Sequence, residues 1–141
     1  MKSAFQEYTQ LMGMIDSAYH EATLKLHLTD SEMDILYVLT VHGQGCPQSA
    51  LYKESGMSKS TVNSAIRKME KEQLLYLTPG FGRNTCVFLT EKGQKLQEET
   101  IYRIMQIENT IYDSWTKEEQ ETFMRLSRDF ARKLSDGVKQ L

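Results

Sequence analysis

The stretch that decides the fold is residues 56–75, Gly-Met-Ser-Lys-Ser-Thr-Val-Asn-Ser-Ala-Ile-Arg-Lys-Met-Glu-Lys-Glu-Gln-Leu-Leu. Its apolar residues recur at the spacing i, i+3, i+4, i+7, which predicts one buried stripe of a helix: Val62, Ala65, Ile66 and Met69. Ser58 is placed to cap the N-terminus of this helix, and Gly56 permits a tight left-handed turn before it.

A second face of the same helix carries small hydrogen-bonding side chains followed by cations: Ser60, Asn63, Ser64, Arg67 and Lys71. Small polar groups can enter a groove of DNA, and cations beside them can meet phosphate. The alternative is a helix that packs on a core by one face and is solvated on the other. The helix alone does not separate these two interpretations.

The totals bound the class of protein. A chain of 141 residues, 40% hydrophobic and 26% charged, is expected to form one domain with a real core. No apolar run approaches the roughly 18 residues that span a bilayer, and the first residues lack the apolar segment of a signal peptide. Two cysteines make neither a disulfide framework nor a zinc ligand set. We therefore expect a cytoplasmic protein without a metal or cofactor.

Charge is unevenly distributed along the chain. The net charge is −2, but residues 46–89 hold six cations against three anions, a net of +3 that leaves −5 for the rest. The cations are Lys53, Lys59, Arg67, Lys68, Lys71 and Arg83, and the anions are Glu54, Glu70 and Glu72. A basic centre between acidic ends is compatible with a surface that faces DNA.

The flanking segments predict further helices and a hairpin. Helical spacing of apolar residues predicts a helix over about 3–26 and another that begins at the capping box of Thr29 and Glu32 and ends near Gly43. Pro47 suits the first turn of a short helix over 48–55, so that two helices meet through a glycine-containing turn.

Two short runs of strand-forming residues follow, 75–78 and 85–89, separated by the turn-rich segment 79–84. They predict a hairpin with a cationic tip. Helical spacing then predicts one helix over about 91–115 and a last one from the capping box of Thr116 and Glu119 to the C-terminus.

This order of elements resembles the MarR family of bacterial winged helix-turn-helix regulators, over the whole chain. Three groups of residues carry the resemblance: Leu28-Thr29 with Ile35-Leu36 and Leu39, then Ser55 to Asn63 with Ile66, Met69 and Glu70, and then Arg83 with Val87, Leu89-Thr90 and Gly93. One position departs from the family pattern, because Phe81 stands where the wing usually carries an Asp two residues before the Arg.

The resemblance implies a mainly α fold with a small β-hairpin wing. It implies a single MarR-like domain over 1–141, with dimerisation helices at 1–27 and 91–141 and a winged helix-turn-helix region at 28–90. It also implies a homodimer whose two recognition helices enter successive major grooves of double-stranded DNA, at the half-sites of a pseudo-palindromic operator about 10 bp apart.

The candidate DNA-binding residues lie on the helix and the hairpin: Ser58, Lys59, Ser60, Thr61, Asn63, Ser64, Arg67, Lys68 and Arg83. Arg67 can reach guanine or phosphate, and Asn63 can pair with adenine. Arg83, on a thin loop, suits a narrow minor groove, where the potential is most negative.

A small-molecule effector is a further expectation from the family. Four residues lie on the helices that border the family's ligand region: Met12, Tyr19, Met33 and Tyr37. Methionine adapts its shape and tyrosine adds a polar tip, which suits an amphipathic ligand. The alternative role for these residues is plain core and dimer interface.

Other reactive side chains predict no second function. His20, His27 and His42 match no local zinc motif. Redox sensing by Cys46 or Cys86 would need a lowered pKa, and no histidine lies beside either residue in the sequence. No catalytic motif is present, so we expect a protein that is not an enzyme.

The sequence therefore predicts a DNA-binding transcriptional regulator, in the form of a homodimeric repressor released by a small molecule. The alternative is a winged-helix module that binds other proteins and has no specific DNA site.

Overall fold

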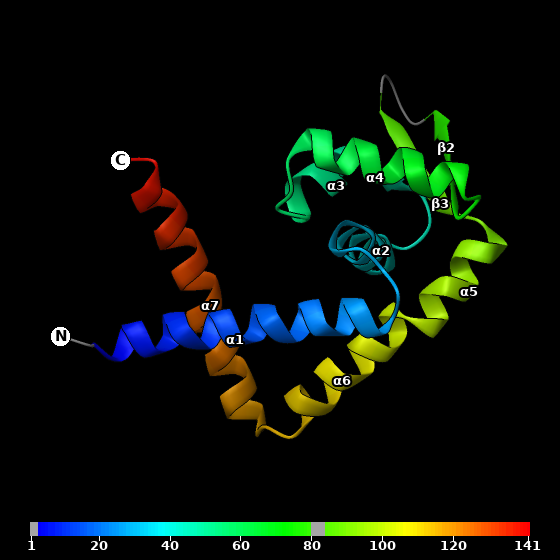
Figure 1. Cartoon of the computed structure of the whole chain (residues 1–141). Helices are drawn as coiled ribbons and strands as arrows, with labels where there is room; N and C mark the ends of the chain where they lie inside the picture. Colours follow the sequence, from blue (N-terminus) through cyan, green and yellow to red (C-terminus); the bar gives the residue numbers. More distant parts are fainter. Residues whose placement is uncertain (1–2, 80–83) are drawn as a thin grey trace. The chain divides into compact units, whose positions relative to one another are not determined.

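The computed structural model describes residues 3–79 and 84–141. Over these residues the chain is mainly helical with one three-stranded antiparallel sheet (Figure 1), so the expected fold class is confirmed. The elements are α1 (Ala4–Lys25), α2 (Asp30–His42), β1 (Cys46–Pro47), α3 (Gln48–Glu54), α4 (Lys59–Lys71), β2 (Leu75–Pro79), β3 (Thr85–Leu89), α5 (Glu91–Glu99), α6 (Ile101–Asp113) and α7 (Lys117–Val138). They form two compact units, Met1–Ile104 and Met105–Leu141.

Helix starts follow the capping pattern of the sequence. Thr29 and Glu32 form the expected capping box of α2: Glu32 N donates to Thr29 Oγ1 over 3.1 Å, and Thr29 N donates to Glu32 Oε1 over 3.0 Å. Thr116 and Glu119 do the same for α7. Each box satisfies backbone N–H groups that have no partner inside the helix. Both predicted starts are confirmed.

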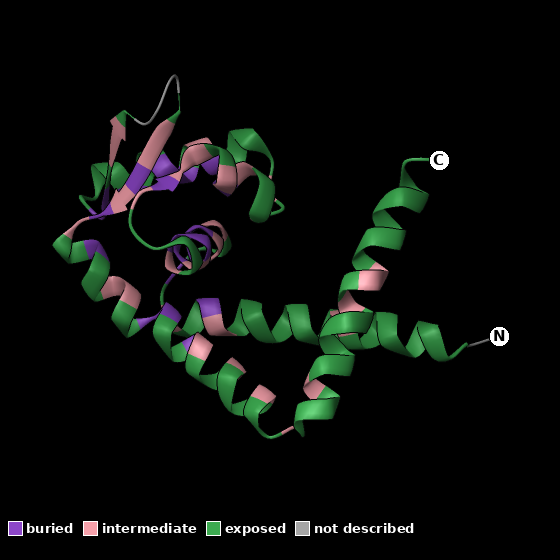
Figure 2. Cartoon of the chain, turned by 180° about the vertical axis from the view of Figure 1, so that it is seen from behind, coloured by how far each residue is buried: buried purple, intermediate pink, exposed green. Residues whose placement is uncertain are grey.

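The core of the first unit is built around α2, which packs against α1, α3 and α4. Ile35 and Leu36 of α2 are fully enclosed, as are Leu51 of α3 and Val62 of α4. Figure 2 shows the buried residues concentrated on α2, on the inner side of α4 and on the sheet. Each of these buried aliphatic side chains contributes about 1.5–3 kcal/mol to the stability of the fold. The apolar stripe of α4 therefore fixes this helix against the core.

Only the C-terminal end of α1 joins this core. Thr23 is the buried residue of the helix among those described, and its hydroxyl lies 2.8 Å from Met33 Sδ of α2. The earlier turns expose large apolar side chains such as Met14 (67% exposed) and Ile15 (51%). The first unit thus covers one end of an apolar helix and leaves the remainder of that helix exposed.

The sheet has the order β1-β3-β2, with β3 in the middle. β2 and β3 form the expected hairpin, with Leu75 opposite Leu89 and Pro79 opposite Thr85. The third strand was not predicted: Cys46 pairs with Val87, and Pro47 with Cys86. A pair of residues is too short to show strand periodicity, and the sequence indicated only that Pro47 suits the first turn of a short helix. In the structure Pro47 is the N-cap residue of α3.

The helix predicted over 91–115 is wrong in one respect, because it is interrupted at Thr100. Here φ is −125° and ψ is −79°, which ends α5, and α6 starts at the next residue. The Thr100 hydroxyl donates to Leu96 O over 2.6 Å, and the residue is 3% exposed. A hydroxyl bonded to the carbonyl four residues earlier competes with helical hydrogen bonding, which favours a bend there.

α5 is held tightly against the base of the hairpin. Thr90 N donates to Leu74 O over 3.1 Å, and Thr90 Oγ1 donates to Gln73 O over 2.6 Å. Gly93, in the first turn of α5, is buried, and a Cβ built on it would lie 1.9 Å from Leu74 O. The close approach of the two backbones therefore requires glycine at position 93.

The second unit turns at a small aromatic cluster. Trp115 lies 5.9 Å from the ring of Tyr112 and 5.0 Å from the ring of Phe123, centroid to centroid. Gln120 Nε2 donates to the carbonyl of Tyr112 over 2.8 Å. No described residue of α7 is buried. In the part of the chain that the structure describes, no helix combines the length and apolar character needed to cross a membrane.

Candidate nucleic-acid interface

The N-terminus of α4 is built as its sequence indicates. Ser58 caps the helix, since Thr61 N donates to Ser58 Oγ over 3.1 Å. Gly56 takes φ +72° in the turn that leads from α3, a conformation that glycine adopts without a steric penalty. The turn and the cap together set the direction in which α4 leaves α3.

α4 presents two distinct faces. Its apolar stripe is buried, with Val62 and Met69 at 0% exposure, as the spacing predicts. The candidate DNA-binding residues on the other side are exposed apart from Asn63, which is half-buried: Ser58, Lys59, Ser60, Thr61, Ser64, Arg67 and Lys68. The face expected to meet DNA is therefore the face that the core leaves uncovered.

Two of the exposed cations have partners within the fold. Lys68 Nζ lies 3.6 Å from Glu32 Oε1 of α2, a carboxylate whose side chain is 9% exposed, and 4.0 Å from Glu72. Lys59 Nζ lies 5.1 Å from the centroid of the Tyr52 ring on α3, close enough for a cation–π interaction. Both lysines help hold α4 to its neighbours.

Three of the candidate DNA-binding side chains have no partner among the described residues. Within residues 3–79 and 84–141, no side-chain hydrogen bond or ion pair engages Ser60, Ser64 or Arg67. They recur along one side of the helix at spacings of four and three residues, two hydroxyls near the N-terminus and the guanidinium further along. Two short donor–acceptor groups and one fork-shaped cation are a suitable set for a groove and its phosphates.

Asn63 sits at the centre of a polar cluster that the sequence did not predict. Its Oδ1 accepts a hydrogen bond from Tyr52 OH over 2.6 Å and another from Gln48 Nε2 over 3.1 Å, and Gln48 Nε2 also lies 2.9 Å from Tyr52 OH. Gln48 and Tyr52 are four residues apart on α3 and share one face of it. That spacing is the signal in the sequence that could have revealed the pair.

The wing residue Arg83 lies outside the described residues, as does Phe81. The strands that lead to it are described, and they remain paired as far as Pro79 and Thr85. The minor-groove role of Arg83 stays a prediction.

Cys46 does not have the environment of a reactive thiolate. Cys46 is 1% exposed, and burial, with smaller contributions from Glu54 and Cys86, raises its pKa to about 11. A thiol with so high a pKa is protonated at neutral pH and is a poor nucleophile. Cys86, on the neighbouring strand, is half-buried.

The histidines that interact are paired with carboxylates. His42 Nε2 contacts Glu54 Oε2, and His20 Nδ1 lies 3.0 Å from Asp30 Oδ1; His27 is exposed. Among the residues described, no three His, Cys, Asp or Glu side chains converge to form a metal site.

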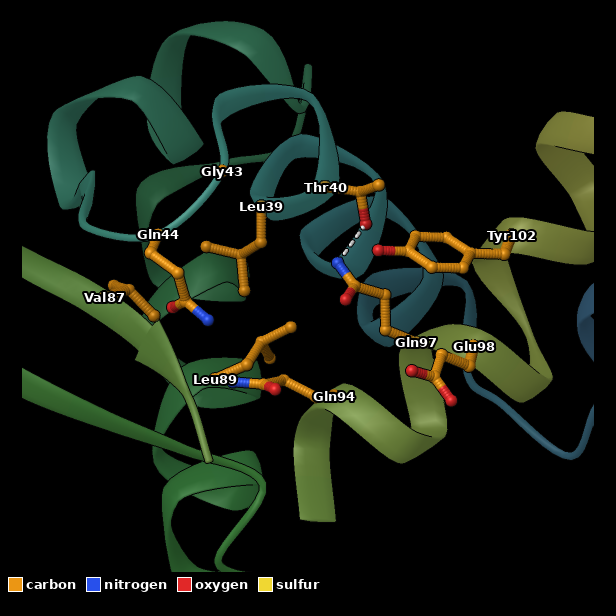
Figure 3. A pocket seen from close by; sticks show the side chains of 10 residues that line it. All are labelled: Leu39, Thr40, Gly43, Gln44, Val87, Leu89, Gln94, Gln97, Glu98 and Tyr102. Atoms are coloured by element: carbon orange, nitrogen blue, oxygen red, sulfur yellow. Dashed lines mark hydrogen bonds between the residues drawn. The ribbon is translucent and has the colours of Figure 1, made fainter. Parts of the chain in front are cut away.

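A pocket of about 230 Å³ opens beside α5 (Figure 3). It is lined by Leu39, Thr40, Gly43, Gln44, Val87, Leu89, Gln94, Gln97, Glu98 and Tyr102. Three of these side chains are aliphatic, and the remainder, Gly43 apart, are polar. Gln97 Nε2 donates to Thr40 Oγ1 over 2.8 Å across the pocket, and this bond links α5 to α2.

The four expected effector residues lie elsewhere on α1 and α2, and none lines this pocket. Met33 is buried at 6% exposure against Thr23. Met12 and Tyr37 are half-buried, and Tyr19 is 36% exposed. Their ligand-binding role stays a prediction.

A helix-turn-helix followed by a β-hairpin on a small sheet defines a winged helix-turn-helix protein. Residues 27–80 match the sequence model of the MarR family. An uncharacterized HTH-type transcriptional regulator of Bacillus subtilis, YwhA, is 25% identical over 114 residues, which are 79% of this chain and 81% of that protein.

Solved structures share the fold. NMB1585, a MarR family regulator from Neisseria meningitidis, superposes with a TM-score of 0.84 at 13% identity, over 99% of each chain. S. aureus MepR, solved as a DNA complex, gives a TM-score of 0.67 at 20% identity, over 96% of this chain and 98% of that one. These comparisons confirm that the chain resembles the MarR family in sequence and in fold.

Proposed function

We propose that this chain is a sequence-specific binder of double-stranded DNA that acts as a homodimeric repressor and is released by a small molecule. It is not proposed to be an enzyme. The observation that carries the proposal is the outer face of α4, where Ser60, Ser64 and Arg67 are exposed and unpaired within the described residues, while the opposite face is locked into the core.

DNA binding is tested by salt titration with a selected operator and with random duplex. A regulator that neutralises several phosphates loses affinity with a slope of about −0.9 per phosphate in log K against log salt. It should also bind the operator at least about a thousandfold more tightly than random DNA. Weak binding with no selected sequence would favour the alternative of a protein-binding winged-helix module.

Arg67→Ala is the matched probe of the α4 face. We expect a loss of about tenfold or more in operator affinity and a salt slope reduced by about one. Arg103→Ala, an exposed arginine on α6, removes the same charge away from α4 and should leave operator affinity almost unchanged. Equal effects of the two variants would contradict a specific role for α4.

Arg83→Ala tests the wing. We expect weaker binding and a smaller preference for A·T-rich flanks, because a cation inserted in a narrow minor groove reads its width and potential. An unchanged affinity would refute the role of the wing.

The homodimer is supported by apolar side chains that the described chain leaves exposed. On α7 these include Leu126 (51% exposed), Leu134 (52%) and Val138 (54%), and α1 exposes a similar set. Contiguous exposed apolar side chains on a soluble protein commonly mark an interaction surface. Leu126→Asp should convert dimer to monomer in sedimentation without lowering the helix content of the chain. Ser135→Asp, which adds the same charge elsewhere on α7, should leave the dimer intact.

A small-molecule effector is supported by the pocket beside α5, which contacts both α2 and α5 close to the break at Thr100. Among the described residues that line the pocket, Glu98 is the one with a charged side chain, so a small amine suits it. Benzylamine should raise the melting temperature more than benzyl alcohol does, and it should weaken operator binding. Glu98→Gln should abolish that difference and Glu99→Gln should keep it. If Tyr37→Phe alone abolished the response, the α1–α2 residues would be the site.

A further inference from the structure

We propose that Asn63 offers DNA only the N–H donors of its side-chain amide, and therefore contacts guanine and not adenine. The inference rests on the proposed function, since it specifies how one residue of α4 reads a base. It follows from the hydrogen bonds that join α4 to α3.

The carbonyl oxygen of the Asn63 side chain is fully used inside the protein. A carboxamide oxygen has two lone pairs. Tyr52 OH donates to one over 2.6 Å, and Gln48 Nε2 donates to the other over 3.1 Å. Tyr52 has one hydroxyl hydrogen, which goes to Asn63, and its oxygen accepts from Gln48 over 2.9 Å. These three hydrogen bonds together use both lone pairs of Asn63 Oδ1 and the one hydroxyl hydrogen of Tyr52.

The cluster is held in place from outside. Lys59 Nζ lies 5.1 Å from the centroid of the Tyr52 ring, and a cation over the ring face restrains it. Gln48 and Tyr52 lie one turn apart on α3, whose Leu51 is fully buried. The orientation of the Asn63 amide is therefore set by α3 before any DNA arrives.

This orientation decides which base can be read. Paired recognition of adenine needs the amide oxygen to accept from N6 while the amide nitrogen donates to N7. In Asn63 that oxygen is occupied, and Nδ2 keeps its two hydrogens. Guanine presents two acceptors, N7 and O6, at the same edge of the major groove and no donor there. Guanine is thus the base that two hydrogens of one amide group fit.

Selection of bound sequences tests the inference with four proteins: the wild-type chain, Asn63→Ala, Asn63→Asp and Tyr52→Phe. The base read by Asn63 is defined as the position in each half-site whose preference disappears in Asn63→Ala. We expect guanine at that position in the wild type. Asn63→Asp keeps an inward oxygen for Tyr52 and replaces the outward donors by an acceptor, so the preference should switch to cytosine, whose N4 donates.

Tyr52→Phe frees one lone pair of the Asn63 oxygen. Adenine should then be accepted at the same position, with the adenine-to-guanine ratio raised about tenfold, as one hydrogen bond to a base edge allows. Should Tyr52→Phe fail to fold, as circular dichroism would show, the two Asn63 variants still decide the matter.

The possible results separate the inference from the function on which it rests. A selected operator with adenine at the Asn63 position, or one in which Asn63→Ala changes no position, would overturn the inference and leave the proposed function standing. The absence of any selected sequence in the wild type would overturn both. Guanine in the wild type together with cytosine in Asn63→Asp would establish the inference.

Discussion

The substitution Gly93→Ala sets two physical effects of opposite sign against each other. Gly93 lies in the first turn of α5, where alanine is favoured over glycine by at most about 1 kcal/mol on helix propensity. The added Cβ, however, would lie 1.9 Å from Leu74 O and 3.1 Å from a methyl carbon of Leu89. Contacts of a Cβ below 3.0 Å are essentially never found, so the two backbones must separate by roughly 1 Å.

That separation removes interactions that can be counted. Two hydrogen bonds would lengthen, the one from Thr90 N to Leu74 O and the one from Thr90 Oγ1 to Gln73 O. The loss of each costs about 1 kcal/mol. Overpacking adds about 1–3 kcal/mol. After subtraction of the propensity gain, we expect Gly93→Ala to lower the free energy of unfolding by about 2–4 kcal/mol.

Urea unfolding followed by circular dichroism measures this. With a slope of about 2 kcal/mol per molar urea, the midpoint should fall by about 1–2 M. Gly13→Ala and Gly137→Ala are controls, because a Cβ at either glycine meets no atom within 4 Å and both positions are helical. They should be neutral or stabilising. A Gly93→Ala chain as stable as the wild type would refute the packing argument.

Three further predictions concern the helix-turn-helix and the sheet. Val62→Asp places a carboxylate at a position with 0% exposure and should destabilise the first unit by more than about 4 kcal/mol. The helical circular dichroism signal should then be lost. A native spectrum together with an altered choice of operator would contradict the core role of Val62. Ser58→Ala removes the acceptor for Thr61 N and should lower the free energy of unfolding by about 1 kcal/mol. Ser58→Asp again supplies an acceptor and should keep the wild-type stability. Equal stability of all three chains would contradict the capping role of Ser58. Burial raises the pKa of Cys46 from 9.0 to about 11, so the thiol ionises at a lower pH in the unfolded chain, and the free energy of unfolding should fall as the pH rises from 9 to 11. This fall should be missing in Cys46→Ala. Rapid alkylation of Cys46 at pH 7 would contradict its burial.

The sequence predicted best where a local rule and the tertiary structure agree. α4 could be placed because its cap residue Ser58, its turn residue Gly56 and its apolar stripe each indicate the same start and the same buried face. The capping boxes of α2 and α7 could be predicted because all the residues of a capping box lie within four consecutive positions of the sequence.

What the sequence did not predict depends on partners that are far apart along the chain. β1 exists because Cys46 and Pro47 meet β3 some forty residues later, and two residues carry no periodicity of their own. The end of α5 at Thr100 interrupts a spacing of apolar residues that continues on both sides of it. The cluster around Asn63 likewise needs α3 and α4 to be packed before its hydrogen bonds exist.

The positions of the prolines in the sheet have a consequence for how copies of this chain meet. The sequence holds two prolines, Pro47 and Pro79, and they fall on β1 and β2, the outer strands on either side of β3. An outer strand with unpaired N–H and C=O groups can recruit a strand from another molecule, and a proline there removes a donor from that edge. Edge-to-edge growth of the sheet is disfavoured on both sides as a result. When many copies crowd together during synthesis, strand pairing between them, which is a route to aggregates, is thereby disfavoured.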